Sequence, residues 1–194
     1  MVLHTLAETA APVPEGRGAV SHEKVALMTK DDPAHELHEL LMRYARSPTA
    51  ADDARDRLFE LQNVVRDGIF DGNSLRADDP RLRDVLDALE LLAVIEPDDP
   101  SHPWARGGAL GAVGRHLEAA SDFLSAADRF ARVAEAEIGI TGDEADWAES
   151  AREHAARHLV LGGQPASAAA LLPSLSEESR GEIEALIERS LATL

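Results

Sequence analysis

The chain has 194 residues and a formal net charge of -17 at pH 7. This acidity argues against nucleic-acid binding, because a surface that binds phosphates needs clustered Lys and Arg. The chain contains no cysteine, which excludes disulfides, thiolate metal sites and thiol chemistry. It contains no run of about 18 apolar residues, so we expect no membrane span and no membrane partner.

The apolar residues predict an all-α protein. Hydrophobic residues make up 44% of the chain, but aromatic residues make up only 4%, and Ala and Leu dominate the rest. This composition suits packed helices and disfavours a sandwich or barrel, which would need alternating β-branched and aromatic residues. Lysine occurs only at Lys24 and Lys30. This bias towards Arg, with so much Ala, indicates a GC-rich bacterial genome, although a salt-loving source also explains the acidity. We expect a cytoplasmic protein, because Glu8 and the missing basic start argue against a secretory signal.

The N-terminal residues 1–30 differ from the rest of the chain. They show no lasting hydrophobic period, and Pro12, Pro14, Gly16 and Gly18 interrupt them. We expect a disordered tail here, followed by a single helical domain over residues 31–194.

Three predicted helices fill the first half of this domain. Each begins where a capping side chain precedes proline, at Asp32-Pro33, Ser47-Pro48 and Asp79-Pro80. Apolar residues at helical spacing follow each start. A polar loop is expected over residues 68–79, with Ile69 and Phe70 as anchors, and a rigid acidic connection over residues 97–103.

The central stretch, residues 104–130, predicts two antiparallel helices that meet at Gly114-Arg115. Gly107, Ala119 and Ala126 are small residues at positions where the two helices would approach closely, and Phe123 would fill the space beside them. The second helix is expected to continue to Ala136.

The last third of the chain predicts three more helices. Capping boxes are expected at Thr141-x-x-Glu144 and Ser174-x-x-Glu177. A helix over residues 143–161 would end at Gly162-Gly163, and a short alanine-rich helix would run from Pro165 to about Pro173. We expect the last helix to cover the end of the stack with an apolar side that includes Leu191.

Two motifs in the central stretch resemble the tetratricopeptide repeat. They are Gly107-x-x-Leu110 in the first helix and Ala119-x-x-x-Phe123 in the second. Residues 82–100 are similar to the second helix of a preceding repeat, and residues 163–172 to the turn and helix start of a following one. The resemblance implies about three degenerate hairpins over residues 47–175, in a short right-handed α-solenoid of about seven or eight helices with a C-terminal capping helix.

The resemblance also implies a function, because tetratricopeptide-like proteins bind peptide segments in a groove lined by the first helices. We therefore expect a non-catalytic adaptor, chaperone or regulatory module that binds a protein or peptide, without cofactor or metal. An apolar groove with an acidic rim would favour a basic or amphipathic segment. The predicted groove contacts are Trp104, Arg106, Trp147 and Arg152.

Two other functions remain open from the sequence. His154 and His158 lie four residues apart on one helix face, which is the spacing of metal ligands, so a metal-dependent helical enzyme is one alternative. Half-buried packing is the simpler interpretation of these two histidines. A self-assembling structural protein is the other alternative, and the sequence does not define the oligomeric state.

Overall fold

The computed structural model describes residues 32–44, 53–71, 74–136 and 143–192. The predicted tail over residues 1–30, the start signal at Ser47-Pro48 and the capping residue Thr141 lie outside these ranges. The described elements are α1 (Pro33–Tyr44), α2 (Arg55–Asp67), β1 (Phe70–Asp71), β2 (Ser74–Leu75), α3 (Arg81–Ile95), α4 (Ser101–Ala112), α5 (His116–Glu135), α6 (Glu144–Leu161), α7 (Pro165–Ala169), the 3₁₀ helix η3 (Leu172–Ser174) and α8 (Glu177–Leu191).

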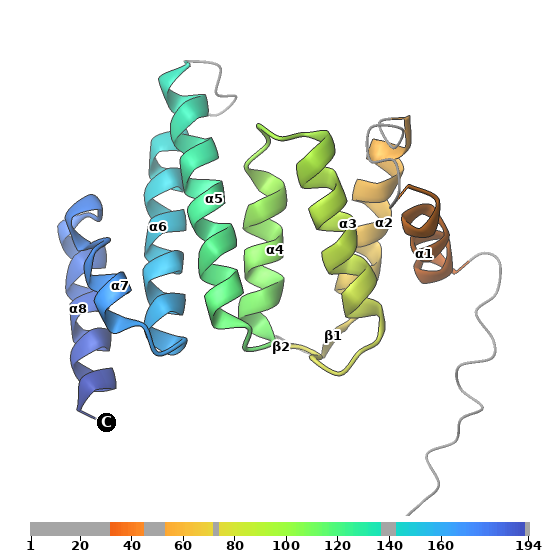
Figure 1. The fold of residues 1–194 in the computed structure, drawn as a ribbon. Coiled ribbons are helices and arrows are strands. Elements are labelled where there is room, and N and C mark those ends of the chain that lie inside the picture. The colour runs from red at the N-terminus through yellow and green to blue at the C-terminus, as the bar shows by residue number, and fades with distance from the viewer. Residues whose placement is uncertain (1–31, 45–52, 72–73, 137–142, 193–194) are drawn as a thin grey trace, which may run out of the picture.

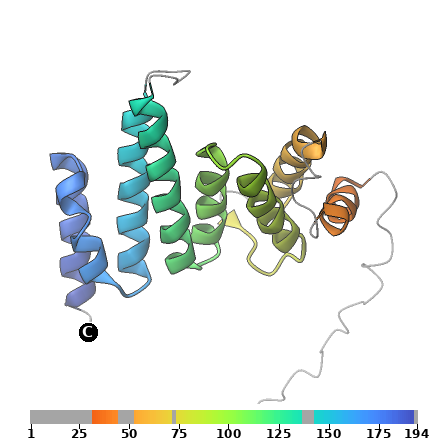
Figure 2. The same ribbon diagram turned by 45° about the horizontal axis from the view of Figure 1, so that its top comes forward.

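The helices stand side by side in a row that follows chain order, from α1 at one end to α8 at the other (Figure 1). Each helix packs on its neighbour in the chain, α1 also contacts α3, and α6 also contacts α8. The same row is seen when the molecule is tilted (Figure 2). The described residues therefore confirm an all-α fold with eight α-helices, and the right-handed solenoid twist stays a prediction.

The capping signals correctly located two helix starts. The backbone N–H of Ala34 donates to Asp32 Oδ1 at 3.0 Å, and that of Arg81 donates to Asp79 Oδ1 at 3.0 Å. These side chains satisfy amides that have no partner within the helix.

Two local predictions for the last helix need correction. The predicted capping box at Ser174 is wrong, because α8 is capped by Ser176, whose Oγ accepts from the Ser179 N–H at 3.4 Å. The Ser174 hydroxyl instead donates to the Leu171 carbonyl. Leu191 is 54% exposed and does not lie on the apolar side of the last helix.

The two predicted connections are more structured than expected. Residues 68–79 contain a short antiparallel hairpin in which Phe70 pairs with Leu75, and Ile69 is fully buried as predicted. The acidic connection is shorter than residues 97–103, because α4 already begins at Ser101. Pro103 is accommodated there because the first turn of a helix leaves its N–H groups without intrahelical partners.

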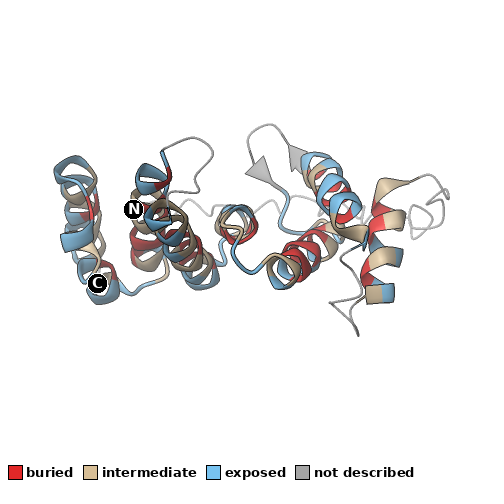
Figure 3. Ribbon diagram, turned by 90° about the horizontal axis from the view of Figure 1, so that it is seen from above, coloured by how far each residue is buried: buried red, intermediate tan, exposed pale blue. Residues whose placement is uncertain are grey.

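The buried residues change in kind along the row. Leucines fill the space between α1, α2 and α3, whereas alanines dominate where α5 packs on α6. Buried residues line the inner sides of the helices along the row (Figure 3).

The predicted turn at Gly114-Arg115 is confirmed between α4 and α5. Gly114 has φ +81°, a conformation that glycine adopts without steric cost. A Cβ at Gly107 would lie only 3.1 Å from the Phe123 ring, so α4 and α5 approach as closely as predicted.

Candidate functional site

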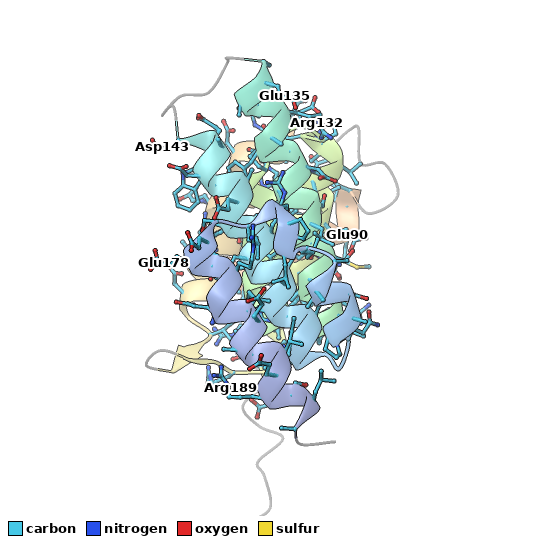
Figure 4. All side chains as sticks on the ribbon, turned by 90° about the vertical axis from the view of Figure 1, so that its left-hand side faces the viewer. Glu90, Arg132, Glu135, Asp143, Glu178 and Arg189 are labelled. Carbon is cyan, nitrogen blue, oxygen red and sulfur yellow. The ribbon has the colours of Figure 1, made fainter. Side chains whose placement is uncertain are left out.

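Helix α3 carries an exposed stripe opposite its buried leucines. Arg83, Asp87, Glu90 and Val94 follow one another by four, three and four residues, which places them on one side of the helix. Seen along the row from the α8 end, Glu90 lies at one edge of the molecule (Figure 4). A hollow lies on each side of this stripe, and we call the stripe and its two hollows the α3 surface.

The first hollow lies between α1 and α3 and has a volume of about 560 Å³. Its apolar lining comes from Leu41 and Met42 of α1 and from Leu91 and Val94 of α3. Met42 is 67% exposed and Val94 is 56% exposed, so this lining faces solvent. Exposed apolar side chains beside a concavity are a feature of binding surfaces.

The second hollow lies between α3 and α4 and has a volume of about 730 Å³. It shares Arg83, Asp87 and Glu90 with the first hollow, so the two hollows adjoin the same stripe. Val113 and Arg115, from the end of α4 and the turn after it, line its far side. A long ligand could therefore contact both hollows from one position over α3.

The charges of the α3 surface are paired to different degrees. Arg83 Nε lies 3.6 Å from Asp87 Oδ2, and both side chains are more than half exposed. Glu90 Oε2 lies 3.1 Å from Arg106 Nη2. Exposed ion pairs contribute about 0–1 kcal/mol, so a cation of a partner could replace Arg83 beside Asp87 at small cost.

The predicted contacts Trp104 and Trp147 come together, but as part of a packed cluster. Their ring centroids are 5.6 Å apart and edge-on. Trp104 also contacts Phe123, Phe130 and His154 edge-on, at centroid distances of 5.4, 6.1 and 5.3 Å. Only Trp147 is largely exposed, at 45%. We call these rings, with His158, the aromatic cluster; it joins α4, α5 and α6.

The predicted contacts Arg106 and Arg152 do not join the two tryptophans on one face. Arg106 links three helices, because its guanidinium donates to Asp122 of α5 at 3.0 and 3.1 Å and to Glu90 of α3 at 3.1 Å. Burial raises the pKa of Asp122, although Arg106 opposes this effect. Arg152 follows Trp147 by five residues, about 140° around α6, so it lies on another side of that helix.

His154 and His158 stack on the same phenyl ring. Their centroids lie 5.0 and 5.6 Å from that of Phe123. His158 Nδ1 lies 3.1 Å from Nδ1 of His116. Burial lowers the pKa of His154, and burial with the nearby His116 lowers the pKa of His158 to about 4. Both rings are therefore neutral near pH 7 and pack as aromatic surfaces.

One set of potential metal ligands was not predicted from the sequence. Among the described residues, a single group has three converging ligand atoms, from Glu96, Asp99 and His102. For residues 97–103 the sequence predicted only a rigid acidic connection, because the burial of His102 depends on contacts with α2 that no local pattern reveals. The spacing E-x-x-D-x-x-H was the available signal.

Compared with known proteins, the chain matches no protein-family model, no curated protein and no solved structure. Within the described part of the chain, no helix is both long and apolar enough to cross a membrane.

Proposed function

We propose that the chain is a non-catalytic binding module whose α3 surface holds a basic, amphipathic segment of a partner protein. The observation that carries this proposal is the hollow between α1 and α3, where exposed Met42 and Val94 lie beside Asp84, Asp87 and Glu90. Apolar side chains of the segment would enter the hollow, and its Lys or Arg side chains would face the carboxylates.

The dimensions and charge favour a helical occupant with one basic side. The stripe from Arg83 to Val94 covers 12 residues with an axial rise of about 16 Å, which matches three turns of a partner helix. The chain's charge of -17 would attract a cationic partner over long range and speed association at low salt. A negatively charged partner would be repelled by the same field.

The proposed architecture is a short right-handed solenoid similar to tetratricopeptide proteins. It is supported by the row of helices that pack on their chain neighbours and by the tight α4–α5 hairpin at Gly107 and Phe123. In such a row the ends and long sides stay open to partners. The predicted groove at Trp104 and Trp147 is less favoured than the α3 surface, because Trp104 already contacts four rings of the protein itself.

The test uses a synthetic fluorescent helical peptide with leucines on one side and lysines on the other. A peptide of the same composition in scrambled order is the reference, because any acidic protein attracts a cationic peptide. We expect the full chain to bind the amphipathic peptide more tightly, with an affinity that falls as salt rises. Equal binding of both peptides would contradict the proposal.

Matched variants locate the peptide on the chain. Asp87→Lys and Val94→Glu are each expected to weaken binding at least tenfold, or about 1.4 kcal/mol. Their controls lie on α2. Asp67 matches Asp87, because its Oδ1 lies 3.6 Å from Nη2 of Arg66, the same distance as in the Arg83–Asp87 pair. Val64 matches Val94, because the two side chains are 50% and 56% exposed. Asp67→Lys and Val64→Glu should bind the peptide like the unaltered chain. Equal losses in test and control variants would place binding outside the α3 surface.

The chain's own lysines provide a further check on the occupant. Lys24 and Lys30 precede α1 in the sequence and are the only lysines of the chain. If the segment that carries them competes for the α3 surface, the Lys24→Glu/Lys30→Glu variant will bind the peptide more tightly than the unaltered chain. If the variant binds the peptide with the same affinity as the unaltered chain, the segment with Lys24 and Lys30 does not compete for the α3 surface.

A further inference from the structure

Three side chains with metal-binding atoms converge where α3 leads into α4. Glu96 follows α3, Asp99 precedes α4, and His102 lies in the first turn of α4. One ligand atom from each lies within 4.8 Å of the others. The His102 side chain is 98% buried, and its Nε2 points at the two carboxylates. A hollow of about 370 Å³ on the α2 side gives access to the group.

The spacing of these atoms is close to that of a metal site. His102 Nε2 lies 2.8 Å from Glu96 Oε2 and 3.6 Å from Asp99 Oδ2. Ligands bonded to Zn²⁺ at 2.0–2.2 Å in tetrahedral geometry are about 3.4 Å apart. An ion could therefore enter between these atoms once His102 Nε2 and Glu96 Oε2 move apart by about 0.6 Å.

Each carboxylate is oriented by a bond through its other oxygen. Glu96 Oε1 accepts from Arg55 Nη1 at 3.2 Å, and Asp99 Oδ1 accepts from the Ser101 N–H at 2.8 Å. Arg129 of α5 donates to the Asp99 carbonyl at 2.9 Å and fixes the backbone. The oxygens Oε2 and Oδ2 remain directed at His102. Such supporting bonds orient ligands in metal sites.

The local charge favours a divalent cation. Arg55 donates to Glu96, but it is also bonded to Asp56, at 2.9 Å from Nε. The charge of Arg55 is thus matched by Asp56, and Glu96 and Asp99 together supply two negative charges for an ion. Two carboxylates with one imidazole suit Zn²⁺, Co²⁺ or Mn²⁺ better than soft ions, which prefer sulfur.

We propose that Glu96, Asp99 and His102 form a divalent transition-metal site, with Zn²⁺ as the best-fitting ion. The site goes beyond the proposed partner binding, because none of its ligands lines the α3 surface. The protein supplies three ligands, and water completes the coordination. His102 Nδ1 is buried without a hydrogen-bond partner, so the imidazole lacks the acceptor that strengthens many sites. We therefore expect micromolar affinity, about 10–100-fold weaker than a fully supported site.

The ion would fasten the α3–α4 connection. Its ligands span the end of one helix and the first turn of the next, and the Phe59 ring of α2 lies edge-on to His102 at 6.1 Å. Because the ligands converge only in the folded chain, bound metal should raise the melting temperature.

The test is titration of the chelator-treated full chain with Zn²⁺ by calorimetry and with Co²⁺ by visible absorption. We expect a single equivalent of micromolar affinity and a Co²⁺ spectrum that Zn²⁺ abolishes. Asp99→Asn should weaken binding at least tenfold, and it is a clean variant because Asn caps a helix as well as Asp does. Asp98→Asn is the matched control: the neighbouring carboxylate is 91% exposed and should be dispensable.

The outcomes separate a defined site from an acidic surface. His102→Gln should also abolish the tight equivalent, and the unaltered chain and Asp98→Asn should gain melting temperature with Zn²⁺ while Asp99→Asn does not. Equal affinities of the Asp98 and Asp99 variants, or many weak equivalents without a tight one, would overturn the proposal.

Discussion

Two parts of the helical row pack by different means. Between α1, α2 and α3 the buried residues are large leucines, such as Leu37, Leu58 and Leu89. Between α5 and α6 they are alanines, such as Ala126 and Ala155, and the aromatic cluster fills the space near α4. Small residues let helix backbones approach closely, whereas large ones keep them apart.

This difference accounts for where a partner could bind. The two hollows of the α3 surface lie in the leucine-rich half, beside helices that large side chains hold apart. Where alanines pack α5 on α6, by contrast, the two helices are in contact over much of their length. The rings of the aromatic cluster there pack on one another, whereas Met42 and Val94 of the α1–α3 hollow are more than half exposed.

The largest effect is expected from removing a leucine of the first half. Leu89 is fully buried in the core that α1–α4 share. Leu89→Ala should lower the free energy of unfolding by about 2–5 kcal/mol, because it removes apolar contacts and leaves a cavity. Urea unfolding monitored by circular dichroism measures this change, and the exposed Val64→Ala is its control. A loss below 1 kcal/mol would mean that this half is loosely packed.

Enlarging a buried alanine tests the close packing of α5 on α6. Ala155 is fully buried on α6, and Ala145 is exposed on the same helix. Ala155→Leu should cost about 1–3 kcal/mol because the added carbons have no space between closely packed helices. Ala145→Leu should change stability by less than about 0.5 kcal/mol. If both variants were equally stable, the contrast between the two halves would be wrong.

A smaller effect is expected at the edge of the aromatic cluster. Trp147 packs on Trp104 and Phe130 but is nearly half exposed. Trp147→Ala should cost about 1–2 kcal/mol, less than a fully buried aromatic residue, because part of the ring already faces water. Thermal unfolding measures the loss. A neutral substitution would favour the sequence-based prediction of Trp147 as a free partner contact.

The smallest effect concerns pH. Folding lowers the pKa of His158 to about 4 from its ordinary value of 6.5, so the folded state disfavours the protonated ring. Stability from this group is complete above pH 6.5 and is lost as pH falls towards 4. Solvent reaches part of the ring, so we expect a loss of only about 1 kcal/mol.

The contribution of His158 is measured as a difference in unfolding free energy between variants, because carboxylates also titrate at low pH. Between pH 7 and 5, the unaltered chain and His35→Gln should lose more unfolding free energy than His158→Gln. His35 is the control because its side chain is 36% exposed and its contact, Glu39, is also exposed. If the unfolding free energies of all three proteins fell in parallel between pH 7 and 5, burial would not lower the pKa of His158.

Local signals in the sequence predicted most of the helices. Asp32, Asp79 and Gly114 mark helix ends by their own chemistry, so their roles were visible without tertiary contacts. The β-hairpin after Ile69 was missed because strands of two residues carry no periodic pattern.

The site was harder to predict because it depends on which helices meet. The tryptophans were correctly placed on α4 and α6, but their mutual contact leaves little of Trp104 for a partner. Met42 and Val94 are unremarkable in the sequence, and only the meeting of α1 with α3 makes them the lining of one hollow. The ligands Glu96 and His102 also acquire their geometry from contacts with α2.

The most direct test compares the two candidate surfaces in one binding measurement. The fluorescent amphipathic peptide is titrated with the unaltered chain, with Asp87→Lys/Val94→Glu and with Trp147→Ala/Arg152→Glu, after circular dichroism has shown that each variant is folded. The α3 surface predicts at least a hundredfold loss of affinity in the first variant and less than a threefold change in the second. Loss in the second variant with full binding in the first would contradict the account and place the partner at the aromatic cluster.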